Sequence, residues 1–183
     1  MTEERVPYEV FTTPVGEFVY PRLTQPDTRY DPDGVYQLKL LLPFEDNETQ
    51  ELIAKIDGVL SAFIQTLDLK VQNMYRRSEV YEKEMTEDGL TETGNVLFKM
   101  KMKAKVTHAK GSFEQAPVVV MADTGEKVEG LVYGGSFGKV KGQIVPYTMA
   151  ANKLVGVTLR LKAVQIHELQ SGTGDSKAFW TEF

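Results

Sequence analysis

The segment 98–106 alternates between apolar residues and lysine, and this pattern constrains the fold more than any other feature. All even positions from Val96 to Val106 are apolar, and the intervening Lys99, Lys101, Lys103 and Lys105 are all cationic. A period of two predicts a β-strand over 96–107 with one buried and one solvated face. Alternate residues of a strand lie about 6–7 Å apart, so we expect a row of four ammonium groups. Such a row is typical of an anion-binding surface, and also of an edge strand whose lysines block aggregation.

The charge of the chain is unevenly distributed. The net charge is −5, but residues 1–94 contain 9 Lys or Arg and 19 Asp or Glu, whereas residues 95–167 contain 11 and 4. Two further expected strands carry paired cations opposite their apolar residues: Lys139 and Lys141 on one, Arg160 and Lys162 on the other. Three basic strand faces favour binding of an anionic polymer.

The hydrophobic patterns predict a mainly β protein with one long helix. The predicted strands cover 10–23 (one or two strands), 35–42, 96–107, 117–122, 139–147 and 154–167. An amphipathic stripe from Leu52 to Leu67 predicts the helix, with Asp46 or Asn47 as its N-cap. The apolar phase of the last strand changes near Ala163, which indicates a bulge. These elements favour a small closed or partly open barrel.

The remaining segments divide the chain into one domain and a tail. We expect a domain over 1–169, in which 69–94 is a long exposed loop with or without a short helix, and this loop carries Arg76 and Arg77. Long loops of this kind are often functional, and these two arginines could close over one side of the basic face. The segment 170–183 begins Gln-Ser-Gly-Thr-Gly and is expected to be a flexible tail.

Several classes of protein are disfavoured by what the sequence lacks. It has no cysteine, no apolar run of membrane-spanning length and no signal-peptide pattern. It also has none of the common nucleotide-binding, hydrolase or zinc-protease motifs. We therefore expect a cytoplasmic, non-enzymatic protein without a cofactor, a metal or a membrane anchor. A nuclease would need a carboxylate cluster for Mg²⁺, and the few acidic residues of the basic segment lie mostly on expected turns.

Aromatic residues are interleaved with the cations of the basic half. Tyr133, Phe137 and Tyr147 lie there, and Tyr147 follows Pro146 at the end of a predicted strand. Proteins that bind single-stranded nucleic acid combine a basic groove with aromatic side chains on which bases stack. Every barrel also has aromatic residues in its core, so this pattern alone leaves the role of Tyr147 open.

An ordered set of short motifs spans residues 10–169. They are Tyr20–Asp27, Gly34–Leu38, the helix after Pro43, Phe98–Lys101, Gly134–Ser136, Lys139–Lys141, Ile144–Tyr147 and a last strand ending at Glu168-Leu169. In this order they resemble the single-stranded DNA-binding proteins of tailed bacteriophages, the OB-fold replication type with a C-terminal phenylalanine. The resemblance implies a five-stranded Greek-key barrel with a helix between strands.

The resemblance also implies roles for particular residues. Lys99, Lys101, Lys139 and Lys141 would contact phosphates, and Tyr147 would stack on bases, as part of phage DNA replication or recombination. In the family, an acidic tail that ends in phenylalanine occupies the basic groove or docks on replication proteins.

The tail of this chain departs from the family pattern. It keeps Phe183 but has few acidic residues, and it contains Lys177 together with Phe179 and Trp180. This composition leaves two interpretations, a hydrophobic hook for phage or host replication proteins and a frayed terminus.

A second function remains open at the level of sequence. An OB-like phage structural or assembly protein could present the same basic face to an acidic protein partner. The sequence also leaves open whether the chain forms a homo-oligomer.

Overall fold

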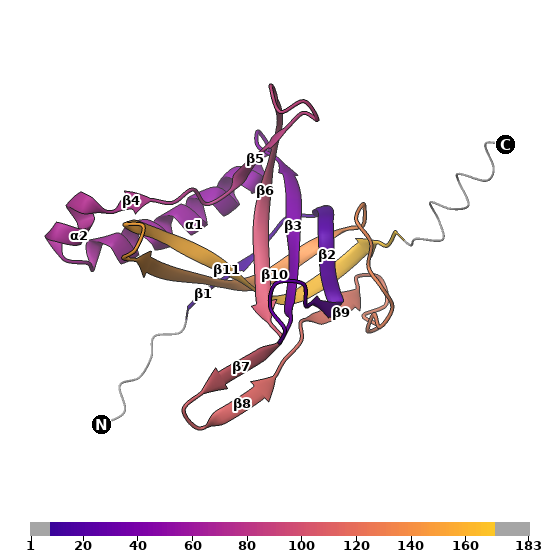
Figure 1. Ribbon diagram of the computed structural model, residues 1–183. Coiled ribbons are helices and arrows are strands. Elements are labelled where there is room, and N and C mark those ends of the chain that lie inside the picture. Colours follow the sequence, from indigo (N-terminus) through magenta and orange to yellow (C-terminus); the bar gives the residue numbers. More distant parts are fainter. Residues whose placement is uncertain (1–7, 171–183) are drawn as a thin grey trace.

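The computed structural model describes residues 8–170, which form a β-rich body flanked by one long helix (Figure 1). The long strands are β2 (Gly16–Asp27), β3 (Val35–Pro43), β6 (Glu92–Lys103), β10 (Phe137–Met149) and β11 (Leu154–Glu168). The short strands are β1 (Glu9–Thr12), β4 (Arg76–Arg77), β5 (Glu82–Met85), β7 (Lys105–His108), β8 (Gly111–Glu114) and β9 (Val118–Met121). The helices are α1 (Asn47–Gln65) and α2 (Leu69–Met74).

The five long strands close into a barrel. β2 pairs with β3, β3 with β6, and β10 with both β11 and β2, and all of these pairs are antiparallel. The circle is completed by a parallel pair between β6 and β11, where Met100 lies opposite Leu159. This confirms the predicted OB-like barrel, with α1 inserted between two of its strands.

The alternation of β6 decides which side of that strand enters the core. Val96, Phe98, Met100 and Met102 are all buried, so the residues between them face outward. Leu38, Leu40 and Leu42 of β3 pack beside them for the same reason.

The long helix packs its apolar stripe on the barrel. Asp46 is its N-cap, and the carboxylate accepts a hydrogen bond from the backbone N–H of Glu48. Leu52, Ile56 and Leu60 are buried against β1, β10 and β11. No helix within residues 8–170 has the length and apolar character needed to cross a membrane.

Two sequence-based expectations need correction. The single strand expected over 96–107 is two strands, because β6 ends at Lys103 and β7 begins a separate two-stranded hairpin at Lys105. The backbone N–H of Ala104 between them donates to Gly34 O, and Ala104 O accepts a hydrogen bond from Gln115 N, which follows the hairpin. The expected long loop over 69–94 contains the strands β4 and β5 as well as the short helix α2, and β5 pairs with β6.

The predicted bulge in the last strand is present. Lys141 pairs with Ala163 and Gly142 pairs with Leu161, so Lys162 has no partner on β10. The extra residue explains the change of apolar phase in the sequence, because residues on either side of a bulge swap faces.

Candidate nucleic-acid interface

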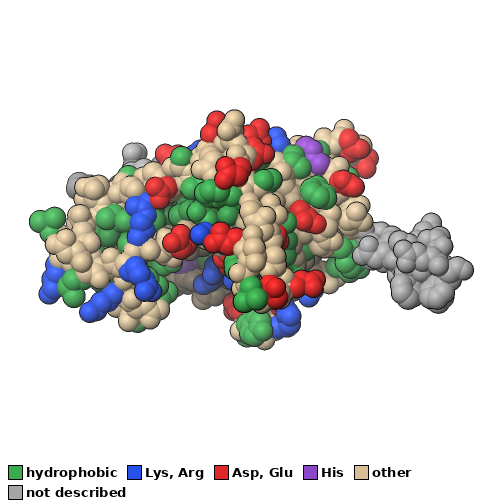
Figure 2. All heavy atoms as spheres, turned by 90° about the horizontal axis from the view of Figure 1, so that it is seen from above, with side chains coloured by type: hydrophobic (Ala, Val, Ile, Leu, Met, Phe, Trp, Pro, Cys, Tyr) green, Lys and Arg blue, Asp and Glu red, His purple; other side chains and the backbone are tan. Residues whose placement is uncertain are grey.

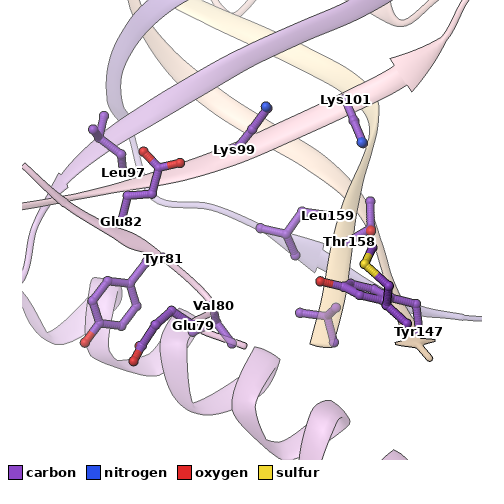
Figure 3. A pocket seen from close by; sticks show the side chains of 12 residues that line it. Glu79, Val80, Tyr81, Glu82, Leu97, Lys99, Lys101, Tyr147, Thr158 and Leu159 are labelled. Carbon is purple, nitrogen blue, oxygen red and sulfur yellow. The ribbon is translucent and has the colours of Figure 1, made fainter. Parts of the chain in front are cut away.

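A groove opens along one edge of β6, where the strand paired with this edge changes from β5 to β11. β3 occupies the other edge of this strand from Asn95 to Lys103. On the edge opposite β3, β5 pairs with β6 as far as Leu97, and β11 begins to pair only at Met100. The gap between β5 and β11 opens into a cavity of about 480 Å³. Its lining comes from Glu79–Glu82, Leu97, Lys99, Lys101, Tyr147, Met149 and Val157–Leu159 (Figure 3).

Two of the predicted cations project into this groove. Lys99 and Lys101 are exposed because the apolar residues between them point into the barrel. Figure 3 shows that Lys101 points toward the side of the cavity that carries Thr158 and Tyr147. Lys99 lies directly opposite Lys39 of β3. Like charges in such a pair repel each other, so the site favours an anion between or beside them.

An acidic side chain partly compensates this charge. The carboxylate of Glu82 accepts a hydrogen bond from Lys39 Nζ at 3.0 Å, and about half of the Glu82 side chain is exposed. Glu79 lines the same cavity. The groove therefore combines cations on its β6 side with carboxylates on its β5 side.

Tyr147 forms the wall opposite the lysines. Its ring lies over Gly156, its partner across the β10–β11 pair. A Cβ atom at Gly156 would come within 2.9 Å of the Tyr147 hydroxyl and 2.8 Å of Ser78 Cβ. The missing side chain at Gly156 thus leaves room for the hydroxyl end of the Tyr147 ring and for Ser78. A half-buried ring held in this way can present one face to a base.

Arg160 is a register neighbour of Lys101 in the parallel β6–β11 pair. It faces outward, since Leu159 and Leu161 on either side of it are buried. Its guanidinium lies 5.6 Å from the centre of the Tyr8 ring. The cationic surface thus continues from β6 onto β11.

The structure places the other predicted site residues elsewhere. Lys103 is at the far end of β6, opposite Val35, and Lys105 belongs to the β7–β8 hairpin. Lys139 lines a different cavity, with Glu48 and Glu51 of α1. Lys141 is exposed between Thr12 and Ala163, and Lys162 is the half-buried bulge residue.

The two arginines of the expected loop do not reach the groove lining. Arg76 pairs with Leu154 at the end of β11. The guanidinium of Arg77 binds the side chain and the backbone carbonyl of Asp57 on α1. The predicted docking residues Phe179, Trp180 and Phe183 lie outside the residues that the structure describes.

Sequence reasoning missed three lining or flanking residues. Lys39, Tyr81 and Glu82 were not singled out. Lys39 was detectable, because the alternation of 35–42 already places it on the solvated face of its strand. Tyr81 and Glu82 have no such signal, because they lie just before and at the start of the short strand β5, in a segment whose sequence predicts a loop. The ring of Tyr81 is anchored between Phe44 and Phe98, at centroid distances of 5.9 and 6.1 Å.

Figure 2 shows that the charges on one face of the molecule are mixed. Acidic side chains gather around the middle of this view, over the β5–β6 hairpin, and one group of Lys and Arg side chains lies toward the α2 and β4 end while others are scattered among the acidic ones. Within residues 8–170, no group of three or more His, Asp or Glu side chains is placed to hold a metal ion. The groove thus brings two lysines, two carboxylates and the ring of Tyr147 into one cavity lining.

The chain is similar to known proteins that bind single-stranded DNA. A family model described as "Single-stranded DNA-binding protein, Bacteriophage T7" matches residues 16–169. The crystal structure of gp2.5, a single-stranded DNA-binding protein encoded by bacteriophage T7, has a TM-score of 0.70 with this chain at 26% sequence identity, and the match covers 94% of each chain. No curated protein sequence matches the chain.

A second solved structure shares the fold at lower identity. The single-stranded DNA-binding protein of bacteriophage Enc34, determined in complex with single-stranded DNA, has a TM-score of 0.60 at 13% identity over 88% of each chain. The family match covers most of the sequence and all five barrel strands. The chain belongs to the family of single-stranded DNA-binding proteins represented by that of bacteriophage T7.

Proposed function

We propose that this protein binds single-stranded DNA in the groove between β5 and β11, during phage DNA replication or recombination. Lys99 and Lys101 contact phosphates, and Tyr147 stacks on a base. The observation that carries the proposal is that these three residues, from two distant strands, line one cavity.

The chemistry of the groove suits a single strand with little sequence preference. When lysine ammonium groups neutralise phosphates, the counterions condensed on the strand are released, and this release favours binding. Every base offers a flat face to an aromatic ring, and stacking of this kind contributes about 1–3 kcal/mol per base. The side chains in question are lysines and a tyrosine, which suit the backbone and the base faces. Binding is therefore expected to depend strongly on salt and weakly on sequence.

The cellular setting is part of the proposal. We infer that the protein is non-enzymatic and acts on DNA in the cytoplasm of a bacterial host, as expected for a phage protein of this family. Phe179, Trp180 and Phe183 would dock on phage or host replication proteins. The test for docking is a pull-down of replication proteins by the full chain and by a chain truncated after residue 170.

Fluorescence anisotropy with a labelled oligothymidine across a salt series tests the main proposal. Lys99→Ala and Lys101→Ala should each make the log–log salt slope shallower by about 0.7, the value for one lost phosphate contact on a single strand. Tyr147→Ala should weaken binding about 5- to 150-fold with little change in slope, because a ring carries no charge.

Matched variants keep this test specific. Lys110→Ala removes a cation at the turn between β7 and β8, outside the groove lining, and should leave the slope unchanged. Tyr147→Phe should retain most of the affinity. Wild-type protein that shows no binding at low salt, or a flat slope, would contradict the proposal. A stable complex with an acidic virion protein in place of DNA would then support the assembly alternative.

A further inference from the structure

The exposed tyrosine at position 20 is held in an unusual conformation. Its side chain is 83% exposed, and its backbone has φ = +49°, a region that residues with a side chain rarely adopt. The cause is a bulge in β2, since Val19 pairs with Lys39 and Arg22 already pairs with Gln37, so that two residues of β2 face one of β3. Bulges of this kind re-aim side chains and are common next to functional sites.

The bulge forms one wall of a second cavity. This cavity has a volume of about 320 Å³ and lies between β2 and the loop 131–134. Tyr133 of that loop lines it from the opposite side and is 40% exposed. The loop is fixed to the strand by two backbone hydrogen bonds, from Gly135 N to Phe18 O and from Phe18 N to Ser136 O. The two tyrosines therefore stand on connected, hydrogen-bonded supports.

The charged side chains that line this cavity are two arginines. Arg22 and Arg29 line it, and its lining contains no carboxylate. This differs from the groove at β6, where Glu79 and Glu82 share the lining with the lysines. The nearby Asp27 is almost fully buried, and its carboxylate is occupied by hydrogen bonds from Arg29 and Gln37. Because the ion pair with Asp27 occupies the Arg29 guanidinium, Arg22 is the cation of this lining that an anion would meet.

The strand register connects this cavity to the groove at β6. Arg22 lies opposite Gln37, and Gln37 lies opposite Lys101. All three positions face outward, and Gln37 itself lines the second cavity. Neighbouring strands are about 4.8 Å apart, so the backbones at Arg22 and Lys101 are separated by roughly 10 Å. A single strand that contacts Lys101 needs only one or two further nucleotides to reach Arg22.

From this juxtaposition we propose that the cavity between β2 and the loop 131–134 is a second nucleotide-binding subsite. Tyr20 and Tyr133 provide stacking surfaces for bases, and Arg22 contacts the phosphate between the two sites. The inference rests on the proposed function and extends it, because it gives the path of the bound DNA over the protein surface. The DNA would run from the groove beside β11 across β6 and β3 to β2.

The test compares oligothymidines of about 4 to 16 nucleotides, the range of lengths bound by single OB folds. Tyr20→Gly removes the ring and also suits the left-handed backbone, so we expect the variant to fold at least as well as the wild type. Its affinity for the long oligomers should fall about 5- to 150-fold, and its affinity for the shortest should not change. Arg22→Ala should make the salt slope shallower by about 0.7 with long oligomers only.

The controls separate this inference from the function on which it rests. Tyr20→Phe should bind like the wild type, and Phe113→Ala removes an exposed ring on the β7–β8 hairpin without an expected effect. If Tyr20→Gly binds long oligomers as the wild type does while Lys101→Ala is impaired, the second subsite is refuted and the groove stands. If Lys101→Ala is also unimpaired, the proposed function itself fails.

Discussion

At the scale of single residues, the groove is governed by a balance between Lys39, Lys99 and Glu82. Lys39 of β3 and Lys99 of β6 are directly opposite each other on paired strands. Lys39 Nζ donates a hydrogen bond to the Glu82 carboxylate at 3.0 Å. An exposed ion pair of this kind contributes little to stability, about 0–1 kcal/mol. Its larger effect falls on a ligand, since a carboxylate in the groove repels phosphate and occupies a cation that could bind it.

Replacement of that carboxylate should strengthen binding. We expect Glu82→Gln to raise the affinity for oligothymidine a few-fold at low salt and to make the salt slope steeper, because Lys39 becomes available to a phosphate. Anisotropy titrations at several salt concentrations measure both quantities. Glu87→Gln, at the exposed tip of the β5–β6 hairpin, is the matched control. Equal or weaker binding by Glu82→Gln would show that the carboxylate does not oppose the ligand.

At the scale of elements, the connection from β2 to β3 is organised by one buried carboxylate. Asp27 accepts hydrogen bonds from the backbone N–H and the guanidinium of Arg29, and from Gln37 Nε2 at 3.3 Å. The Arg29 side chain thereby lowers the pKa of Asp27 from 3.8 to about 2. A carboxyl whose pKa is lower in the folded protein stabilises the fold above about pH 4, and this contribution disappears as the pH falls toward 2.

This linkage predicts a specific pH dependence. The free energy of unfolding of the wild type should decrease between about pH 4 and 2, partly through protonation of Asp27. Arg29→Gln should show a smaller decrease over the same window, because its Asp27 would titrate nearer to 3.8. Urea unfolding at a series of pH values measures this, with Lys70→Gln as a surface-charge control. Parallel curves for Arg29→Gln and the wild type would rule out this role for Arg29.

At the scale of the whole molecule, the barrel distributes its cations over several surfaces. Lys99 and Lys101 share the groove with Tyr147, whereas Lys139 lines a cavity with Glu48 and Glu51 of α1. Resemblance to the phage family implies that Lys139 contacts phosphate. The geometry instead gives it two acidic neighbours in a separate cavity.

The variants Lys139→Ala and Lys101→Ala show whether Lys139 contacts the bound DNA. We expect Lys139→Ala to weaken binding of short oligothymidines less than about twofold and to leave the salt slope unchanged, whereas Lys101→Ala should reduce both. The two variants remove the same charge and differ only in position. A loss for Lys139→Ala as large as that for Lys101→Ala would place the bound strand along β10.

Features that depend on neighbouring residues could be predicted from the sequence, and features that depend on distant segments could not. The burial of Phe98 and Met100, and the exposure of Lys99 and Lys101, could be predicted because a period of two is a local property of a strand. The end of β6 at Lys103 could not be predicted, because Ala104 and Val106 continue the alternation, whereas β7 pairs with β8 in a separate hairpin.

By itself, the sequence determined the class of fold, the helix, and the face of each strand that is solvated, since hydrophobic burial acts on each residue through a local period. Only the tertiary structure decided which cations and rings meet. Lys101 and Tyr147 line one cavity because β11 pairs in parallel with β6 while β5 occupies the same edge, and Lys101 aligns with Arg22 because β3 lies between them. These pairings are selected by the packing of the whole core, and no local pattern encodes them.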